Sequence, residues 1–335
     1  MILRENVALG QYTTLKVGGV ADYVVEVGNL EELKEACLFA KQTNRPPLIL
    51  GGGSNVLIGD EGYPGLVIIM NIKGRTYRYE GDQCLLVLGA GEIFDDVVRE
   101  TCEKSLWGLE NLSSIPGSVG ATPVQNVGAY GVEVSSLIKK VVAINFETLK
   151  EKTFSNDECG FLYRDSFFKS DAGKSWVITS VTFGLSKILV PQLSYADLAP
   201  LREQKNVSPQ MVRKSIEDIR SQKFPDWHTI GTAGSFFKNP IIETMHYEQL
   251  KQQYPELVGY LYDGNVKVSL GWILDKVCGL KGHCEGNVCL FEKQALVLVT
   301  QPNATAKDIK SFTKHIQEKV FTATKIKIET EVLFV

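Results

Sequence analysis

Two glycine-rich stretches hold the residues best suited to bind an anion or a flat ligand. The first is the run Gly51-Gly52-Gly53-Ser54-Asn55, directly after the apolar segment 47–50. Consecutive glycines allow positive φ angles and let backbone N–H groups approach a phosphate closely. The run lacks the Gly-Lys-Ser/Thr ending of a P-loop, and the chain has no Gly-x-Gly-x-x-Gly fingerprint of a Rossmann domain. A phosphate-binding loop and a plain strand-to-strand turn both fit these residues.

The second stretch, 115–131, alternates glycine and small residues with polar ones and carries almost no charge. This composition suits a backbone that lies flat against a planar ligand, whereas a solvated loop usually carries more charge. The surrounding segment 109–131 has no periodicity, and long loops inside compact domains are usually functional. We therefore expect an ordered, functional loop here.

Three motifs add polar side chains that could take part in a reaction. Arg164 could clamp a carboxylate or a phosphate, although a surface pair with Asp165 is the commoner role of a single arginine. Ser235 follows a small-residue turn without Gly-x-Ser-x-Gly, so a proton donor or a turn cap fits better than a nucleophile. Glu329 and Glu331 share one face of a strand, and the pattern neither chooses between them nor excludes a solvated face.

Charge and cysteine usage argue against nucleic acid, metal and disulfides. The net charge of −3 gives no global field that would attract nucleic acid. The spacing of His283, Cys284 and Cys289 matches no familiar zinc pattern, so we expect no metal. The seven cysteines are scattered and are expected to be reduced. The helix after Ser208 is expected to present a solvated basic face that contains Arg213, Lys214, Arg220 and Lys223. Arg220 and Lys223, near the end of this helix, are candidates for diphosphate contacts.

Length and periodicity define the elements that must position these residues. A chain of 335 residues with 44% hydrophobic and 22% charged residues predicts a soluble protein of more than one compact unit. The first residues have no apolar signal-peptide region, and the longest apolar runs are too short to span a bilayer, so we expect a cytoplasmic protein. Helices are predicted at 30–40, 92–102 (with Ile93 inward), 209–223, 269–278 and 305–320. Strands are predicted at 47–50, 66–70, 84–90, 139–146, 176–183, 295–300 and 326–335, which gives an α+β or mixed α/β fold.

Taken in chain order, these motifs resemble those of the UDP-N-acetylenolpyruvoylglucosamine reductases, also called UDP-N-acetylmuramate dehydrogenases. The resemblance covers the chain from about Thr13 to Val335, and the segments around 195–198 and 241–263 look like the larger of the family's two classes. One motif would be weak evidence, but all of them in register are specific. They are the stretches 51–55, 115–117, 125–131, 163–166, 234–240 and 329–332.

The resemblance implies an α+β fold of the vanillyl-alcohol-oxidase/PCMH type. It implies two FAD-binding subdomains, at 1–71 (with the final strand 332–335) and 72–224, and a C-terminal α+β substrate domain at 225–331. It also implies non-covalent FAD, NADPH as the hydride donor, and reduction of UDP-N-acetylglucosamine enolpyruvate to UDP-N-acetylmuramate in peptidoglycan precursor synthesis. The expected protein is a monomer with no nucleic-acid partner and no membrane partner.

The resemblance also assigns roles to single residues. Arg164 would stabilise the enolate, Ser235 would donate the proton, and Glu331 would orient the carboxylate end of the substrate. The family often has Arg where this chain has Leu333, which puts any substrate contact there in doubt. Substrate contacts are expected from Tyr195, Lys223, Asn239, Tyr260, Lys267 and Gln294. FAD contacts are expected from Gly51, Gly52, Gly53, Ser54, Asn55, Val56, Leu57, Ile115, Pro116, Gly117, Gly120, Ala121 (through its backbone), Thr122, Gly128 and Arg220.

Three other functions compete with this interpretation. An FAD oxidase of the same fold would share the glycine stretches, but it would not need Ser235, Glu331 and a third domain. A nucleotide-sugar-binding protein without catalysis would have lost Arg164, Ser235 or Glu331, and all three are present. A serine hydrolase needs a histidine partner, and none of the four histidines can be placed next to Ser235.

Overall fold

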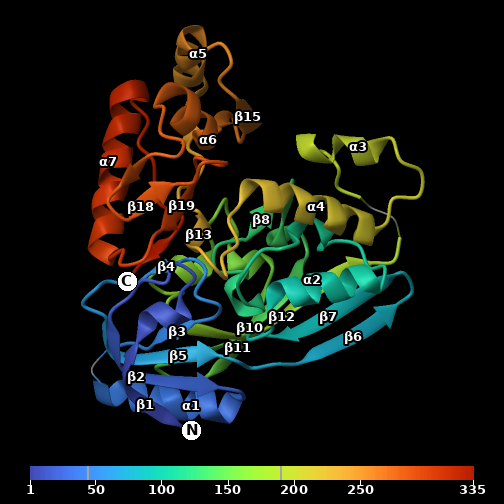
Figure 1. Ribbon diagram of the computed structural model, residues 1–335. Helices are drawn as coiled ribbons and strands as arrows, with labels where there is room; N and C mark the ends of the chain where they lie inside the picture. Colours follow the sequence, from blue (N-terminus) through green and yellow to red (C-terminus); the bar gives the residue numbers. More distant parts are fainter. Residues whose placement is uncertain (44, 189–190) are drawn as a thin grey trace. The chain divides into compact units, whose positions relative to one another are not determined.

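A computed structural model describes residues 1–43, 45–188 and 191–335 (Figure 1). The chain divides into two compact units, and each is described by itself. The first unit comprises residues 1–7, 21–52 and 63–220, and the second comprises 8–20, 53–62 and 221–335. The chain passes from one unit to the other between Gly52 and Gly53, inside the first glycine run. The finer division into two FAD-binding subdomains and a substrate domain stays a prediction.

The first unit contains two large sheets and a small hairpin, β8–β9. One sheet has the order β1-β2-β5-β3, with β5 parallel to β2 and β3. The other is antiparallel, with the order β11-β10-β12-β7-β6. The strands are β1 Leu3–Ala8, β2 Val20–Val27, β3 Leu48–Leu50, β5 Tyr63–Met70, β6 Arg75–Glu80, β7 Gln83–Gly89, β8 Gly128–Ala129, β9 Val132–Glu133, β10 Ile138–Asn145, β11 Glu151–Ser155 and β12 Trp176–Ser186.

The helices of the first unit bury one apolar face each. In α1 the side chain of Asn29 caps the helix by accepting a hydrogen bond from the Glu32 amide. The inner faces of α1 and α2 join the two sheets in one hydrophobic core. Ile93 is not inward, as the sequence had suggested, because it caps α2 and is 53% exposed. The helices are α1 Leu30–Ala40, α2 Phe94–Glu103, α3 Ala199–Arg202 and α4 Pro209–Lys223. Short 3-10 turns are η2 Lys41–Thr43, η3 Glu110–Leu112, η4 Val119–Ala121, η5 Val134–Ser136, η6 Asp157–Cys159, η7 Phe167–Lys169 and η8 Ala196–Leu198.

The second unit is built from three small sheets and three helices. The sheet orders are β13-β19-β18-β17, β14-β16-β15 and β20-β4. A capping box between Thr305 and Asp308 begins the long helix α7, whose apolar face packs into the core of this unit. The strands are β4 Val56–Leu57, β13 Gly231–Ser235, β14 Ile241–Ile242, β15 Gly259–Tyr262, β16 Asn265–Val268, β17 Cys284–Glu285, β18 Val288–Leu290, β19 Val297–Thr300 and β20 Leu333–Phe334. The helices are α5 Thr244–Gln253, α6 Leu270–Trp272 and α7 Ala306–Thr324, with a 3-10 turn η1 Leu9–Tyr12 and a π turn η9 Ile273–Val277.

Two expectations for the second unit are wrong. The strand predicted over 326–335 is a strand only at β20, because the segment before it makes a single bridge, Phe237 to Thr330, and no continuous ladder. The cysteines are not all reduced, because Cys284 and Cys289 form a disulfide. The hairpin β17–β18 sets these two residues directly opposite each other, a pairing that the apolar periodicity of the sequence could not reveal.

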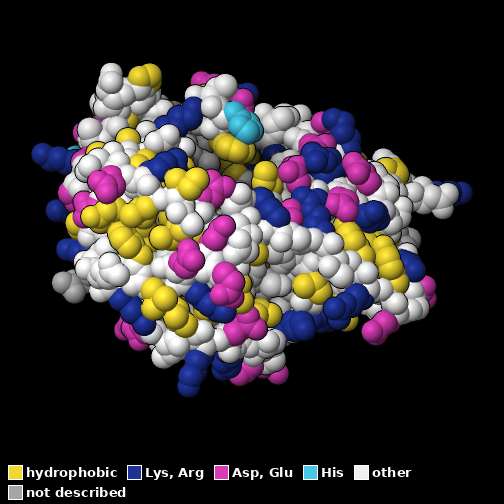
Figure 2. Space-filling model, turned by 90° about the horizontal axis from the view of Figure 1, so that it is seen from below, with side chains coloured by type: hydrophobic (Ala, Val, Ile, Leu, Met, Phe, Trp, Pro, Cys, Tyr) yellow, Lys and Arg dark blue, Asp and Glu magenta, His cyan; other side chains and the backbone are white. Residues whose placement is uncertain are grey.

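No helix in the described ranges is both long and apolar enough to cross a membrane. The face shown in Figure 2 carries basic and acidic side chains interspersed. This mixture agrees with the small net charge of −3. Among residues 1–43, 45–188 and 191–335, no group of three His, Cys, Asp or Glu side chains is arranged to hold a metal ion.

Candidate active site

The first unit brings the two predicted glycine stretches into direct contact. A Cβ atom on Gly51 would lie 2.1 Å from the Ser118 hydroxyl, and one on Gly52 would lie 2.7 Å from the Gly117 Cα. Real Cβ atoms do not approach other atoms so closely. At Gly52 the obstacle is main chain, so this position requires glycine, whereas at Gly51 the obstacle is the Ser118 side chain. The result is a cradle of main chain, which is the kind of surface that can approach a pyrophosphate. The residues present therefore fit FAD.

The turn that follows in the second stretch is also held by close main-chain packing. The amide of Gly120 donates to the Ala90 carbonyl at 2.8 Å, and a Cβ on Gly120 would lie 2.6 Å from the Ala90 Cβ. Thr122 is buried, and its hydroxyl donates to the Val119 carbonyl at 2.8 Å. Ala121 is exposed, so its backbone is accessible at the surface of this unit.

Arg164 lies beside the second stretch and is held by its carbonyl groups. The guanidinium donates to the carbonyl oxygens of Gly128, at 2.6 Å, and Asn126, at 3.4 Å. Arg164 has a φ of 54°, and Ser114, Asn126 and Tyr130 have φ values of 59°, 47° and 48°. Non-glycine residues with such angles are uncommon and are strained, and strain of this kind clusters at functional sites. The loop therefore has the character of a preorganised site.

Asn126 is a positioning residue that sequence reasoning did not single out. Its side-chain amide donates to the Glu133 carboxylate at 2.9 Å and to the Leu162 carbonyl at 3.0 Å. Its side-chain oxygen accepts from the Ser135 amide at 3.1 Å. Asn126 is buried, so these bonds fix the loop against the segment that precedes Arg164. The sequence marks Asn126 only as a polar residue inside the uncharged stretch 115–131. Its positioning role depends on contacts with later residues such as Leu162, which this stretch does not reveal.

On helix α4, Arg213 does not belong to the solvated basic face that the sequence suggested, whereas Lys214 is exposed as expected. Arg213 is buried and makes a bidentate pair with Asp95, at 2.6 and 3.0 Å. Asp95 also accepts from the amide of Ser114 at 2.6 Å. Burial by itself raises the pKa of Asp95, but the hydrogen bonds from Arg213 and Ser114 outweigh it and hold this pKa below its usual range. The ion pair therefore ties α2 and α4 to the start of the functional loop.

Tyr195 and Arg220 lie around Tyr130 in the same unit. The rings of Tyr130 and Tyr195 meet edge to face at 5.0 Å. The pKa of Arg220 is lowered by burial, an effect that a hydrogen bond with the Tyr130 hydroxyl partly offsets. The guanidinium of Arg202 donates to the carbonyls of Leu193, Ser194 and Tyr195 at 2.6, 2.8 and 3.3 Å. The backbone that carries Tyr195 is therefore clamped by a charged side chain.

The second unit brings Ser235 and Glu331 together across a long stretch of sequence. β13 is bulged between Thr232 and Ser235, where Gly234 has a φ of 71°. Such a bulge re-aims the next side chain. The amide of Glu331 donates to the Phe236 carbonyl at 2.8 Å. Asn55, from the first glycine run, donates through its side chain to the Glu331 carbonyl at 3.2 Å.

The two carboxylates of the final segment have different surroundings. Glu329 has a side chain that is 75% exposed, and it pairs with the ammonium of Lys238 at 3.1 Å. Glu331 is half-buried beside the strand of Ser235. The strand pattern could not choose between these residues, and the family resemblance pointed to Glu331. Glu329 faces solvent with its own counter-ion, whereas Glu331 lies beside the strand that carries Ser235.

The remaining predicted contacts of the second unit lie near its small sheet. Tyr260 is on β15, is 61% exposed, and stands opposite Lys267 on β16. Asn239 accepts a hydrogen bond from the Leu270 amide at 3.0 Å, which anchors α6. Gln294 accepts from the Leu296 amide at 3.3 Å.

Lys223 is the last residue of α4 and is half-buried. Ile115 and Pro116 lie half-buried in the functional loop of the first unit, and Val56 and Leu57 form the buried strand β4 after Ser54.

Comparisons with known proteins agree with this arrangement. The model of the FAD binding domain matches residues 21–145, and the model of the UDP-N-acetylenolpyruvoylglucosamine reductase C-terminal domain matches residues 225–335. The chain is 39% identical to the UDP-N-acetylenolpyruvoylglucosamine reductase of Bdellovibrio bacteriovorus over 99% of both chains. It is 38% identical to the same enzyme of Neisseria gonorrhoeae over 98% of this chain and 96% of the relative.

A solved structure extends the similarity to the fold. The crystal structure of UDP-N-acetylenolpyruvylglucosamine reductase from Thermus caldophilus has a TM-score of 0.69 and 27% sequence identity, and the match covers 99% of each chain. The predicted α+β class, with an FAD-binding part followed by a C-terminal domain, is confirmed. The chain therefore belongs to the UDP-N-acetylenolpyruvoylglucosamine reductase family, and it is an FAD-dependent oxidoreductase.

Proposed function

We propose that the chain reduces UDP-N-acetylglucosamine enolpyruvate to UDP-N-acetylmuramate, with NADPH as the hydride donor, in peptidoglycan precursor synthesis. The chemistry that bound FAD supplies is the relay of a hydride from NADPH to the enolpyruvyl double bond. The observation that carries the proposal is the pairing of the Ser235 strand with the Glu331 segment, in a chain that also matches the FAD binding domain. An FAD oxidase of the same fold would not explain the match to the reductase C-terminal domain.

The two glycine stretches are the proposed FAD ligands. Gly51, Gly52 and Gly120 support this role because a side chain at these positions would be crowded by close neighbours, and Gly117, with a φ of 117°, lies against Gly52. Main-chain N–H groups therefore remain the surface that a pyrophosphate can approach. Neither stretch contains His or Cys, which agrees with non-covalent binding. Arg220 adds a half-buried cation for the cofactor's negative charge. The other proposed contacts are Gly53, Ser54, Asn55, Val56, Leu57, Ile115, Pro116, Ala121, Thr122 and Gly128.

Three residues are proposed to act on the substrate directly. Negative charge builds on the substrate as an enolate, and Arg164 stabilises it as a fixed cation, since the Gly128 carbonyl already holds its guanidinium. Ser235 donates the proton to the α-carbon, and a positioned proton donor typically contributes ~10²–10⁴-fold to a rate. Glu331 orients the carboxylate end of the substrate. It does so as the protonated acid, because a bare anion would oppose the enolate.

The remaining polar residues are proposed to bind the nucleotide-sugar part of the substrate. Tyr260 and Lys267 stand side by side on paired strands, which offers a phenol and an ammonium to one phosphate or hydroxyl. Tyr195 supports the same role because its ring is partly exposed on a clamped backbone. The other proposed contacts are Lys223, Asn239 and Gln294. We further propose that the protein is monomeric and works in the cytoplasm, where NADPH and nucleotide sugars are available.

Anaerobic flavin spectroscopy tests the proposal. The purified protein is expected to be yellow, NADPH should bleach it, and UDP-N-acetylglucosamine enolpyruvate should restore the colour. Addition of UDP-N-acetylglucosamine without the enolpyruvyl group is the control and should leave the bleached state unchanged. A protein that takes up no FAD, or one that stays bleached with the enolpyruvyl substrate, would refute the proposal. Light scattering during size-exclusion chromatography measures the molar mass of the protein and so tests whether it is monomeric.

A further inference from the structure

The disulfide of the second unit staples a two-residue hairpin. Cys284 on β17 and Cys289 on β18 are direct partners in the antiparallel pair, with Cα atoms 4.1 Å apart. The amide of Leu290 donates to the His283 carbonyl at 2.9 Å, so the cysteine pair occupies the neighbouring non-hydrogen-bonded position. The turn is made by Gly286, with a φ of 57°, and Asn287. The cross-link therefore joins two strands that the backbone already pairs.

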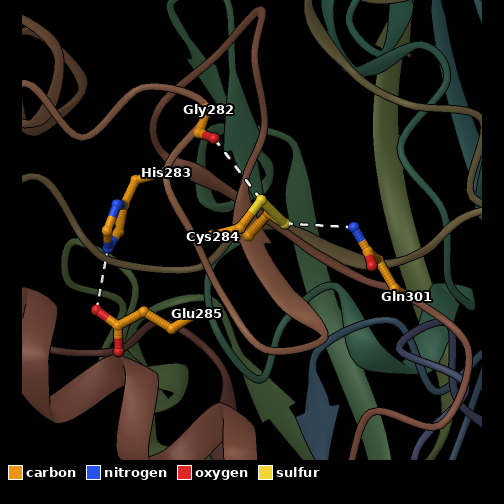
Figure 3. The surroundings of a disulfide bond; sticks show 6 residues. Gly282, His283, Cys284, Glu285 and Gln301 are labelled. Carbon is orange, nitrogen blue, oxygen red and sulfur yellow. Dashed lines mark hydrogen bonds and ion pairs between the residues drawn. A yellow bond between two sulfur atoms is a disulfide. The ribbon is translucent and has the colours of Figure 1, made fainter.

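The two sulfur atoms of this cross-link have different surroundings (Figure 3). Cys284 is exposed on the edge strand, whereas Cys289 is 5% exposed. The side-chain amide of Gln301 points to the Cys289 sulfur at 3.7 Å. Thiol–disulfide exchange begins with attack on one sulfur, and the rate depends on access to that sulfur and on how well the other leaves. The geometry here gives access at Cys284 and an N–H donor beside the leaving sulfur at Cys289.

We propose that Cys284 and Cys289 form a reversible thiol–disulfide exchange site for a dithiol reductant. A thiolate of the dithiol attacks the Cys284 sulfur, the S–S bond breaks, and its electron pair goes to Cys289 as a thiolate beside Gln301. The second thiolate of the dithiol then attacks its own sulfur in the mixed disulfide and releases Cys284. The protein gains two electrons and two protons, and the dithiol is oxidised to a disulfide. A disulfide in a protein proposed to work in the cytoplasm is expected to be transient in this way.

A second set of contacts holds the hairpin whichever state the cysteines are in. The Glu285 carboxylate lies 3.0 Å from a ring nitrogen of His283 and 2.7 Å from one of His315 on α7. These bonds attach β17 to the long helix independently of the sulfur atoms. Reduction is therefore expected to loosen the edge of the sheet locally and not to unfold it.

The effect of reduction reaches the strand that carries Ser235 through one row of the sheet. Cys284 pairs with Cys289, Cys289 pairs with Val299 on β19, and Val299 pairs with Thr232 on β13. Thr232 stands directly before the bulge that aims Ser235. The redox state of the hairpin therefore changes the rigidity of the sheet that supports this residue. A disulfide stabilises a protein by restricting its unfolded chain, and the effect is modest for a loop this short. We therefore expect the dithiol form to melt about 3–6 °C lower than the disulfide form.

Thiol counting on the full-length, FAD-loaded protein tests the proposal. After air oxidation, unfolding and alkylation without reductant should label five of the seven cysteines, because the structure has five free ones. A brief treatment of the native protein with dithiothreitol before alkylation should raise the count to seven and lower the melting temperature. The Cys289→Ser variant, mixed with glutathione disulfide, should gain one glutathione on Cys284 without unfolding.

Controls distinguish exchange at this site from general reactivity. Cys278→Ser, which changes a half-buried cysteine outside the hairpin, should keep the reductant-dependent change of two thiols and of the melting temperature. Cys284→Ser should abolish both. Seven labelled thiols in the oxidised protein, or a disulfide that dithiothreitol opens only after the protein unfolds, would overturn the proposal. Neither result would bear on the proposed reductase activity, which is measured separately.

Discussion

The two units fix their functional residues in different ways. In the first unit, Gly52 is needed because the main chain of Gly117 lies against it, at a distance that leaves no room for a Cβ atom, and the Ser118 side chain crowds Gly51 in the same way. In the second unit, Gly234 has open space around it and is needed only for its φ of 71°. The cofactor part is thus specified by close approach, and the strand of Ser235 by a bulge. The difference predicts which substitutions each unit tolerates.

Gly52→Ala should have the largest effect. Its Cβ would meet the Gly117 Cα at 2.7 Å, and backbone cannot move aside as a flexible side chain can. We expect loss of bound FAD and with it loss of activity, measured as the flavin-to-protein absorbance ratio. Gly52→Asn should be as damaging, because a residue that tolerates positive φ gains nothing here. Gly28→Ala, at an exposed glycine of the same unit, is the control, and equal FAD loss there would refute the steric argument.

Gly234→Val should have the next largest effect, and it should slow turnover more than Gly234→Asn does. A β-branched residue is strained at this φ by about 1–2 kcal/mol, whereas Asn tolerates the left-handed region. If the bulge moves to relieve about 1.4 kcal/mol of strain, only about a tenth of the molecules keep Ser235 in position, so the valine variant is expected to bind FAD normally but to turn over about tenfold more slowly. The asparagine variant should stay close to the unsubstituted protein. Equal losses in both variants would mean that space, and not backbone conformation, is limiting at Gly234.

The ion pair of Asp95 with Arg213 predicts an acid-dependent stability of the first unit. The pKa of Asp95 is held below its usual range in the folded protein, although burial alone would raise it. Its contribution is therefore present above the pKa of an unfolded aspartate and is lost as the pH falls through the lower, folded value. Asp95→Asn should lower the melting temperature at pH 7 and flatten its dependence on pH below about pH 5. Asp96→Asn, at the next residue of α2, is the matched control and should leave the slope unchanged.

Glu329→Gln should have the smallest effect. Glu329 is largely exposed and pairs only with Lys238, and exposed pairs contribute about 0–1 kcal/mol. We expect nearly unchanged kcat and KM for Glu329→Gln in steady-state assays. Glu331→Gln keeps the neutral charge of the proposed acid but alters its geometry, so it should be slower than the unsubstituted protein. Glu331→Ala should be slower than Glu331→Gln. Loss of activity in Glu329→Gln that matches Glu331→Ala would contradict the choice between the two carboxylates.

Helices could be predicted from the sequence where the residues that define them, the cap and the apolar face, lie close together along the chain. Amphipathic periodicity predicted helices at 30–40 and from 305 onward, and the structure has α1 and α7 there, capped by Asn29 and Thr305. Ile93 was placed on the wrong face because the helix begins at Phe94, two residues after the predicted start at 92. Each glycine stretch was identified as a candidate binding loop, but the contact between the two depends on packing that no single motif records.

Features that join distant segments could not be predicted in the same way. Arg213 looked like a surface cation because its partner Asp95 lies on another helix. The strand pattern did not separate Glu331 from Glu329, whose different surroundings depend on the pairing of the final segment with Phe236 and on the position of Lys238. The disulfide needed the register of a hairpin whose strands are too short to show a period.

Anaerobic stopped-flow kinetics of Ser235→Ala test the central claim most directly. The account predicts that NADPH bleaches the variant at a rate close to that of the unsubstituted protein, because Ser235 takes no part in flavin reduction. Reoxidation by UDP-N-acetylglucosamine enolpyruvate should be slowed by about 10²–10⁴-fold, the usual contribution of a positioned proton donor. Ser311→Ala, an exposed serine of α7, should change neither half-reaction. Equal slowing of both half-reactions in Ser235→Ala would contradict its role as the proton donor.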